Sequence, residues 1–139
     1  MSSGYGTQIT QIKKYLFNSA LKRMSCLIQV NNDQGSNLRI VSKGAPEVLK
    51  HYLKEIPADY DSTYLPYVKD GARVLALAWK PVPKMNQLEV NAYTREEAEK
   101  GLIFCGFIIA ECPLKEDTLS VIEELKHSSH EVKMITGDN

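Results

Sequence analysis

The feature that most constrains the fold is a strand-like run that passes directly into a helix-like run. Residues 38–42, Leu-Arg-Ile-Val-Ser, are short and rich in β-branched side chains, which favours a strand. Residues 47–53 carry apolar side chains at helical spacing. The junction between them, residues 43–46, reads Lys-Gly-Ala-Pro, in which Pro46 suits a first helical turn and Gly44 permits another group to approach the backbone closely. A lysine there either helps to hold an anion or is solvated in an ordinary β-to-α turn, and these residues alone favour the second interpretation.

Composition limits the class of protein. The 139 residues fit one domain, or one domain and part of another, and a hydrophobic content of 43% predicts a packed core. Lys+Arg and Asp+Glu balance at 17 each, so the chain has no whole-molecule attraction for nucleic acid or for a membrane, although a local basic site remains possible. No apolar run reaches the roughly 18 residues that a membrane-spanning helix needs. Three cysteines without metal-binding spacing favour a reducing compartment, and we expect Cys26 and Cys105 to be buried in strands.

A hairpin is expected around the polar, turn-rich residues 31–37. The apolar run 24–30 predicts its first strand, and its second strand leads into Lys43. Phe17 and Lys22 precede the first strand, so they can lie on the same side as Lys43. An aromatic ring and two lysines can hold a base and a phosphate, although a single phenylalanine is more often a core residue.

Further elements are expected on both sides of this hairpin. Residues 1–14 are polar and predict a flexible lead-in, and residues 56–68 predict a loop with a possible short helix. Residues 74–79 predict a buried strand, which Arg73 begins and Pro81 ends. The planar fork of Arg73 can bind a phosphate, but a surface ion pair is the better interpretation in isolation.

The last third of the chain changes character. Thr94 and Glu97 form a capping-box pattern that predicts a short solvated helix. The nearly all-apolar residues 102–110 predict a central strand covered on both faces. Beyond a domain boundary near Pro113, a helix up to about residue 127 and a strand over residues 131–136 indicate a βα-type element, the kind that binds ligands at its strand ends.

Common catalytic and metal-binding signatures are absent from the sequence. His51, His127 and His130 share no ligand spacing with cysteine or carboxylate residues, and no Ser-His-Asp, Cys-His, GxGxxG or Walker A pattern occurs. We therefore expect no metal site in this chain.

Four separated stretches, taken together in order, carry a resemblance that none of them carries alone. They are residues 17–25, 43–47, 71–76 and 134–139. The ordered set resembles the nucleotide-binding domain of a P-type ATPase running into its phosphorylation domain, and it covers the chain from about Tyr15 to Asn139. Residues 19–25 and 112–115 are most similar to the type V branch, particularly its endoplasmic-reticulum members.

The resemblance implies an α+β fold. An antiparallel β-sheet flanked by helices would span residues 15–112 as the nucleotide-binding domain. Residues 113–139 would be a hinge and the helix-strand beginning of an α/β haloacid-dehalogenase-like phosphorylation domain, which is incomplete here. The apolar residues of that segment would then lack the domain into which they normally pack.

The resemblance also assigns roles by position. Phe17 matches the aromatic residue that stacks on adenine, and Lys22 matches a basic residue near the phosphates. Lys43 and Gly44 match the floor of the adenine pocket. Arg73 matches the arginine that reaches the nucleotide phosphates.

Two further groups of residues match positions outside the adenine pocket. Thr136, Gly137 and Asp138 match the motif around the transferred phosphate. Pro113 and Lys115 match the hinge, which reads Cys-Pro-Leu-Lys where the family usually has Asp-Pro-Pro-Arg. The acidic residue and one proline are therefore missing, while Lys115 keeps the positive charge.

The function implied by the resemblance is ATP binding within a membrane pump. ATP would be positioned for phosphoryl transfer to an aspartate in an Asp-Lys-Thr-Gly-Thr motif, which this chain lacks, together with the Gly-Asp-Gly-x-x-Asn-Asp motif whose aspartates bind Mg²⁺. We therefore expect nucleotide binding without turnover, with Mg²⁺ arriving on the nucleotide. The expected partners are the phosphorylation, actuator and membrane domains of a parent chain in the endoplasmic-reticulum membrane, with this domain in the cytosol and no nucleic acid bound.

Two alternatives remain open at this point. One is an interaction module of the same fold with little nucleotide affinity, which the altered hinge favours and the retained Phe17, Lys43 and Arg73 disfavour. The other is a haloacid-dehalogenase-like hydrolase, suggested only by residues 136–138, for which the chain offers no convincing nucleophilic aspartate.

Overall fold

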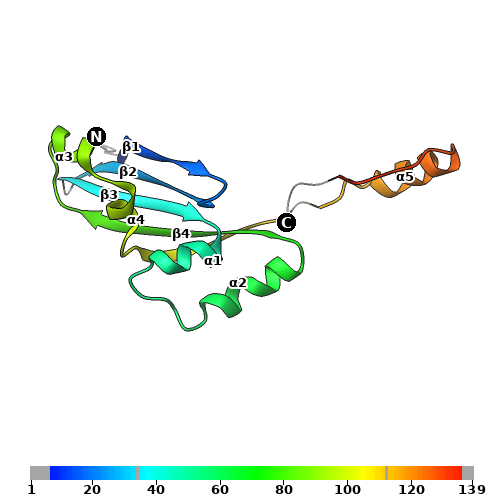
Figure 1. Cartoon of the computed structure of the whole chain (residues 1–139), viewed down its shortest axis with the longest axis horizontal. Helices are drawn as coiled ribbons and strands as arrows, with labels where there is room; N and C mark the ends of the chain where they lie inside the picture. The colour runs from blue at the N-terminus through cyan, green and yellow to red at the C-terminus, as the bar shows by residue number, and fades with distance from the viewer. Residues whose placement is uncertain (1–6, 34, 112, 136–139) are drawn as a thin grey trace, which may run out of the picture.

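The computed structural model describes residues 7–33, 35–111 and 113–135. These residues form a five-stranded antiparallel sheet whose strands lie side by side in their sequence order (Figure 1). The strands are β1 (Gln8–Asn18), β2 (Arg23–Asn32), β3 (Gly35–Gly44), β4 (Arg73–Val82) and β5 (Ile103–Ala110). The helical elements are α1 (Pro46–Leu49), the 3₁₀ turn η1 (Lys50–Tyr52), α2 (Tyr60–Lys69), α3 (Gln87–Ala92), α4 (Arg95–Glu99) and α5 (Thr118–His127). The expected antiparallel sheet with helices, an α+β fold, is confirmed.

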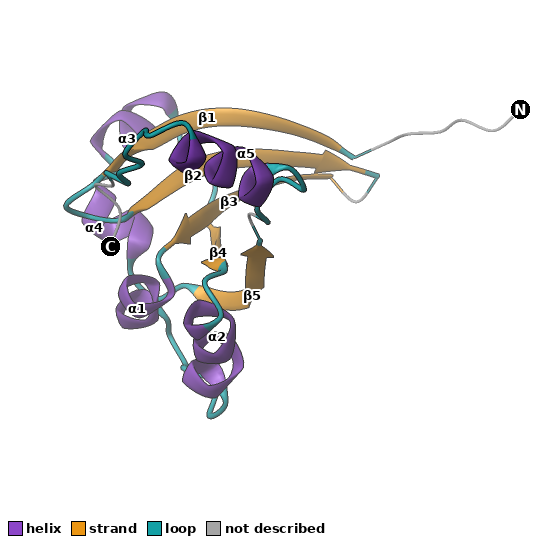
Figure 2. Cartoon of the chain, turned by 90° about the vertical axis from the view of Figure 1, so that its right-hand side faces the viewer, coloured by secondary structure: helices purple, strands orange, loops and turns teal. Residues whose placement is uncertain are grey.

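The two faces of the sheet differ in what covers them. In β2, the side chains of Arg23, Ser25 and Leu27 are buried. Met24 and Cys26, which alternate with them, are only half-buried. Helices α1, α2 and α4 contact the strands and share the core with the buried set, and Figure 2 shows them on one side of the sheet. We call this side the covered face and the opposite side the open face.

An aromatic cluster forms the centre of the core under α2. The Tyr60 ring lies 4.9 Å from the rings of both Phe104 and Phe107 in β5 and 5.8 Å from the ring of Tyr64, measured between centroids. The Tyr60 hydroxyl donates a hydrogen bond of 3.0 Å to the carbonyl of Pro46. One buried side chain therefore joins α2 to α1 and to β5, with edge-to-face ring contacts that add to simple burial.

The hairpin expected around residues 31–37 is confirmed. β2 and β3 pair without interruption from Arg23 opposite Gly44 to Asn32 opposite Gly35. The strand expected to begin at Arg73 is confirmed as well. These elements are encoded by local patterns, which explains why they are predictable.

The expected flexible lead-in is wrong for residues 8–14, which form the first part of β1 and pair with β2. The polar character of this segment has a structural use. The ammonium group of Lys13 donates hydrogen bonds of 2.8–2.9 Å to the carbonyls of Val90, Asn91 and Tyr93, at the end of α3. A lysine that satisfies the last carbonyls of a helix looks the same in a sequence as a solvated one.

The expected strand end at Pro81 is also wrong, because β4 continues to Val82 and Pro81 pairs with Arg39 of β3. Pairing between β4 and β5 stops at Trp79 opposite Ile103. Among the described residues, β4 therefore has a neighbouring strand on one side only at Pro81. A residue without an N–H group is tolerated where no second ladder needs it.

The prediction of a central strand over residues 102–110 is wrong, since β5 lies at the edge of the sheet. Ile103, Ile108 and Ile109 are exposed. Cys105 is exposed too, and Cys26 is half-buried, so the expected burial of both thiols is not found. An apolar run indicates hydrophobic side chains but cannot distinguish a covered strand from an edge strand with an open face.

The short helices follow their caps. The capping box of Thr94 and Glu97 at the start of α4 is confirmed, and the possible helix within residues 56–68 is found as α2. A second capping box, formed by Asn86 and Glu89, begins α3, which the sequence analysis did not predict.

The segment after Pro113 contains the expected helix, α5, which stands away from the sheet (Figure 1). The strand expected over residues 131–136 is not found in residues 131–135, which have no regular secondary structure. Val132, Met134 and Ile135 are exposed. A strand needs a neighbour for its backbone groups, and no described strand pairs with this segment. The helices in the described part of the chain are all too short or too polar to cross a bilayer.

Candidate functional site

The five residues that the resemblance assigns to nucleotide binding, and that the structure describes, lie at one end of the sheet. β1 and β3 end there, and β2 and β4 begin there. Lys43 is opposite Met24, and Gly44 is opposite both Arg23 on one side and Ala76 on the other. The antiparallel order thus gathers segments that are far apart in sequence.

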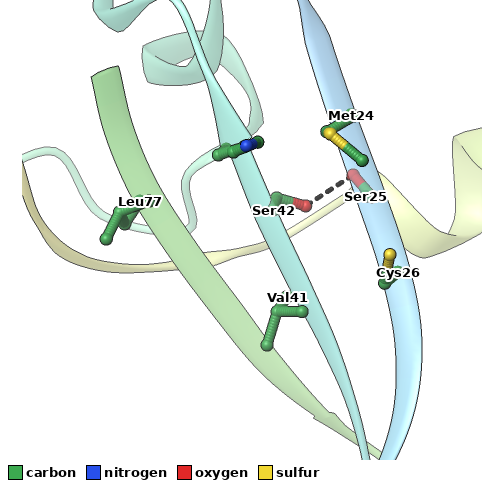
Figure 3. Close-up of a pocket in the computed structure, with 7 residues that line it drawn as sticks. Met24, Ser25, Cys26, Val41, Ser42 and Leu77 are labelled. Atoms are coloured by element: carbon green, nitrogen blue, oxygen red, sulfur yellow. Dashed lines mark hydrogen bonds between the residues drawn. The ribbon is translucent and has the colours of Figure 1, made fainter. Parts of the chain in front are cut away.

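A hollow of about 260 Å³ opens at this end of the sheet (Figure 3). Its lining residues are Met24, Ser25, Cys26, Val41, Ser42, Lys43 and Leu77. Met24, Cys26, Val41 and Leu77 make the hollow largely apolar, and Lys43 is the one charged residue in its lining. A mostly apolar pocket with a few polar groups is the usual form of a small-molecule or cofactor site.

Phe17 lies beside this hollow at an irregularity in β1. Tyr15 is opposite Ser25 and Asn18 is opposite Arg23, so both Leu16 and Phe17 occupy the register position of Met24. Such a bulge redirects side chains at a sheet edge. The side chain of Phe17 is 63% exposed, whereas Tyr15 is buried in the core. The core interpretation of Phe17 is therefore excluded, and its ring is available to a ligand.

Lys22 occupies the tight turn between β1 and β2. Its backbone is in the left-handed region, with φ of 49°, and its N–H donates to the Asn18 carbonyl at 2.8 Å. Its ammonium group lies 3.9 Å from the Glu47 carboxylate, and both side chains are about half exposed. An exposed pair of this kind contributes little to stability, so Lys22 can exchange Glu47 for another anion at small cost.

Gly44 explains how the junction closes. A Cβ at this position would lie 2.7 Å from the Arg23 Cβ and 2.9 Å from the Lys22 carbonyl oxygen. The Ala45 N–H donates to that same carbonyl at 3.0 Å. Gly44 therefore permits residues 22 and 23 of this chain, and not a ligand, to approach its backbone closely. This contact packs the start of α1, at Pro46, against the β1–β2 turn.

Arg73 begins β4 at the same end of the sheet and is opposite Ala110 of β5. It is three residues before Ala76, the partner of Gly44, so its Cα lies roughly 10 Å further along the sheet. Its side chain is exposed. This position separates Arg73 from the apolar hollow by a distance that a nucleotide, but not a base alone, can span.

The two predicted hinge residues do not line the hollow. Pro113 and Lys115 are exposed. Pro113 lines a separate depression of about 310 Å³ together with Asp70 and Glu111. Residues 136–138 (Thr-Gly-Asp) lie outside the described part of the chain. Within residues 7–33, 35–111 and 113–135, no three His, Cys, Asp or Glu side chains are placed to hold a metal ion.

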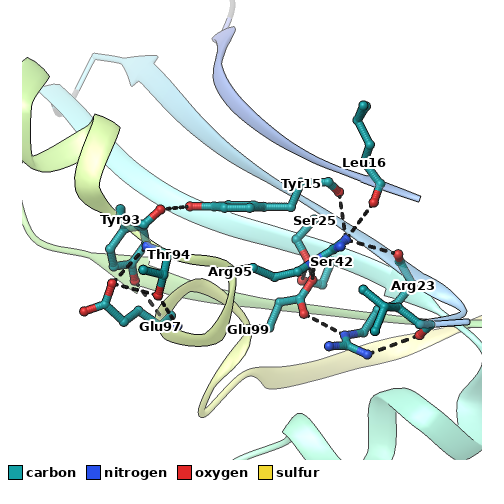
Figure 4. A network of polar contacts seen from close by, with 11 residues as sticks. Tyr15, Leu16, Arg23, Ser25, Ser42, Tyr93, Thr94, Arg95, Glu97 and Glu99 are labelled. Carbon is teal, nitrogen blue, oxygen red and sulfur yellow. Dashed lines mark hydrogen bonds and ion pairs between the residues drawn. The ribbon is translucent and has the colours of Figure 1, made fainter. Parts of the chain in front are cut away.

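A buried polar network beneath the hollow was missed by the sequence analysis (Figure 4). Glu99, the last residue of α4, accepts hydrogen bonds from the Arg23 Nε at 2.6 Å, the Ser25 hydroxyl at 2.8 Å and the Arg95 Nε at 3.0 Å. The Ser25 and Ser42 hydroxyls are 2.6 Å apart. The sequence predicts a solvated helix here, whereas the Glu99 side chain is buried. The one sequence feature that could have indicated a buried carboxylate is the position of Glu99 directly after the small residue Ala98, which is also buried.

Tyr15 borders this network. Its hydroxyl donates to the Tyr93 carbonyl at 2.8 Å. Burial, followed by the nearby Tyr93, Glu97 and Glu99, raises the pKa of Tyr15 to about 12. Tyr15 is therefore neutral at physiological pH and acts as a hydrogen-bond donor.

A family model for the P-type ATPase cytoplasmic domain N matches residues 2–117. This range includes all five strands and the hollow. The chain belongs to the P-type ATPase N-domain family.

Several curated proteins are similar to this N domain. The endoplasmic reticulum transmembrane helix translocase of Saccharomyces cerevisiae is 45% identical over 128 residues, covering 92% of this chain and 10% of the relative. The probable manganese-transporting ATPase PDR2 of Arabidopsis thaliana is 42% identical over 135 residues, which cover 97% of this chain and 11% of the relative. The probable cation-transporting ATPase 13A5 of Homo sapiens is 34% identical over 133 residues, which cover 94% of this chain and 11% of the relative. The N domain thus spans about a tenth of the length of these relatives, which match the type V branch suggested by the sequence.

Proposed function

We propose that this N domain binds ATP in the open-face hollow and orients it for phosphoryl transfer to an aspartate outside the chain. The observation that carries the proposal is the hollow itself, with Lys43 in its lining and the exposed Phe17 at the register position of Met24. The adenine would lie on the apolar floor against the Phe17 ring, and the triphosphate would extend toward Lys22 and Arg73. Binding and orientation are the contribution of such a domain, because the transfer chemistry needs groups that lie elsewhere.

The apolar floor supports stacking as the main source of affinity. Stacking on an aromatic side chain contributes about 1–3 kcal/mol per base, whereas an exposed lysine–phosphate contact contributes less. We therefore expect weak binding and similar affinities for ATP and ADP, since both carry the same adenine. Mg²⁺ would arrive coordinated by the phosphates and would take most of its protein ligands from outside the described residues.

The parent protein would be an ATP-driven membrane pump of the type V branch. The similarity to the endoplasmic reticulum transmembrane helix translocase of Saccharomyces cerevisiae supports that membrane as its location. This domain would lie on the cytosolic side, where ATP is available, with residues 113–139 leading into the phosphorylation domain. Thr136, Gly137 and Asp138 would then approach the phosphate that is transferred.

The proposal is tested by calorimetric titration of the chain with ATP, repeated with Lys43→Glu and Phe17→Ala. Each substitution should weaken binding about fivefold or more and leave the melting temperature nearly unchanged. The structure offers matched controls. Ile9 is also 63% exposed and lies near the far end of the same strand, so Ile9→Ala controls for Phe17→Ala. Lys84 is exposed beyond the far end of β4, so Lys84→Glu controls for the change of charge.

Three outcomes distinguish the alternatives. Saturable binding that both pocket substitutions weaken and both controls preserve supports nucleotide delivery. Equal affinity in all variants would contradict the assignment of the pocket. No binding up to millimolar ATP would favour the second candidate function, an interaction module, for which the altered Cys-Pro-Leu-Lys hinge is the supporting observation.

A further inference from the structure

The carboxylate of Glu99, at the end of the short helix α4, accepts three hydrogen bonds from other side chains. Its side chain is 1% exposed, and its carboxylate lies against two guanidinium groups and one hydroxyl. A buried ion pair is often no better for stability than a well-packed apolar side chain of similar size. Stability alone is therefore a weak explanation for a buried carboxylate at this point, and the groups that it holds give a better one.

The first connection runs through two hydroxyl groups to the floor of the hollow. The Ser25 hydroxyl donates its one proton to the Glu99 Oε1. The Ser42 hydroxyl, 2.6 Å from the Ser25 oxygen, must then be the donor in their shared hydrogen bond. The carboxylate thus fixes the direction of a chain that crosses from β2 to β3. Ser42 directly precedes Lys43, and both residues line the hollow.

The second connection runs through Arg95 to the bulge in β1. The Arg95 Nε donates to the Glu99 Oε1 at 3.0 Å. Its Nη2 donates to the Leu16 carbonyl at 2.7 Å and to the Tyr15 carbonyl at 3.2 Å. Leu16 directly precedes Phe17 and shares its register position opposite Met24. Glu99 therefore holds the guanidinium that holds the backbone next to Phe17.

We infer that Glu99 is a positioning residue of the nucleotide pocket, which sets the Lys43 strand and the Phe17 bulge at one fixed separation. This inference rests on the proposed ATP binding. Glu99 lies under the sheet on the covered face and is not among the residues that line the hollow. By restricting the positions of the Phe17 ring and Lys43 before the ligand binds, Glu99 reduces the conformational entropy that is lost on binding.

The test is the dissociation constant for ATP of Glu99→Gln, measured by calorimetry well below the melting temperature of each variant. The amide keeps the size of the side chain but removes the charge that holds Arg23 and Arg95. We expect affinity to fall about fivefold or more. Val90→Ala, a substitution of another buried residue remote from the hollow, should lower the melting temperature without changing the affinity.

A second measurement separates positioning from a general loss of stability. Combining Glu99→Gln with Phe17→Ala and Lys43→Glu should add little further weakening, because the groups through which Glu99 acts are already gone. If Glu99→Gln does not fold, Ser42→Ala and Arg95→Gln each interrupt one connection, and each should weaken binding by a smaller factor.

The outcomes keep the two proposals apart. Wild-type binding with unchanged affinity in Glu99→Gln, or in both Ser42→Ala and Arg95→Gln, would overturn the positioning role and leave ATP binding intact. A full, additive loss in the combined variant would overturn it as well. Absence of saturable binding by the wild-type chain would overturn the proposed function itself.

Discussion

The covered and open faces of the sheet are built from the same strands but do different work. On the covered face, helices α1, α2 and α4 bury an aromatic cluster and a carboxylate with two arginines. On the open face, an apolar hollow and several exposed hydrophobic side chains have no covering layer among the described residues. Stability is thus concentrated on one face, and the proposed ligand site lies on the other. Substitutions should therefore separate the two properties according to the face that they alter.

The largest expected effect tests the covered face at its centre. Tyr60→Ala removes a ring that is 1% exposed and contacts three other aromatic rings. We expect a loss of about 3–5 kcal/mol in the free energy of unfolding, measured by urea denaturation. Tyr60→Phe is the control, because it keeps the ring and loses only the 3.0 Å hydrogen bond to the Pro46 carbonyl, about 1 kcal/mol. A smaller loss of unfolding free energy in Tyr60→Ala than in Tyr60→Phe would contradict the placement of Tyr60 in the core.

The next effect concerns residues 43–46, the junction between β3 and α1. In Gly44→Ala, the new methyl group would lie 2.7 Å from the Arg23 Cβ and 2.9 Å from the Lys22 carbonyl, neither of which is the end of a flexible side chain. Overpacking of this kind costs about 1–3 kcal/mol, and the shift of β2 against β3 should also weaken ATP binding. Gly35→Ala, at the opposite end of β3 with nothing within 4 Å of its Cβ position, is the spatial control, although its φ of 115° adds local strain. Preserved affinity in Gly44→Ala would show that the junction does not shape the pocket.

Adjacent residues of β4 give the most direct comparison of the faces. Val74 is 8% exposed on the covered face, and Leu75 is 38% exposed on the open face. Val74→Ala should cost about 1.5–2.5 kcal/mol, from roughly 0.8 kcal/mol per buried methylene and the cavity left behind. Leu75→Ala removes more atoms but should cost less than about 1 kcal/mol, the scale of one cross-strand pair, here with Ile108. The reverse order in thermal or urea denaturation would mean that the open face is covered in solution.

Local patterns made much of this architecture predictable. The β2–β3 hairpin, the start of β4 at Arg73 and the capping box of α4 each depend on neighbouring residues, and each was found where the sequence placed it. The expected hairpin placed Phe17 on the same side as Lys43, the family resemblance assigned both to a nucleotide pocket, and the register supports their proximity through their shared neighbour Met24.

The errors share one physical cause, which is that a side chain's neighbours are set by tertiary structure. Lys13 looked like part of a solvated lead-in because the carbonyls that it satisfies lie 77–80 residues away. The β5 run looked central because hydrophobicity does not show where a sheet ends. Glu99 looked solvated because its partners Arg23 and Ser25 come from β2, 74–76 residues earlier in the chain. No window of the sequence contains these contacts.

The smallest expected effect compares two carboxylates of the same helix. Glu99 of α4 is buried, whereas Glu97, two residues earlier, caps the exposed start of the helix. Hydrogen bonds from the backbone N–H and then the side chain of Thr94 lower the pKa of Glu97 below its usual range. Because the pKa is lower in the folded state, the stabilisation is present above the unfolded pKa and is lost as the pH falls through the folded one. Wild type should therefore lose slightly more stability on acidification than Glu97→Gln.

The pKa of Glu97 can be measured by NMR titration in wild type and in Thr94→Ala, which removes the hydroxyl and leaves the backbone donor. The pKa should rise part of the way toward its ordinary value, because only the weaker of the two Thr94 contributions is lost. ATP affinity should stay unchanged in Thr94→Ala, since the Thr94 hydroxyl hydrogen-bonds with Glu97 and not with Glu99 or the guanidinium of the adjacent Arg95. A change in affinity there would mean that the whole of α4, and not Glu99 in particular, sets the pocket, and the difference between the two carboxylates would disappear.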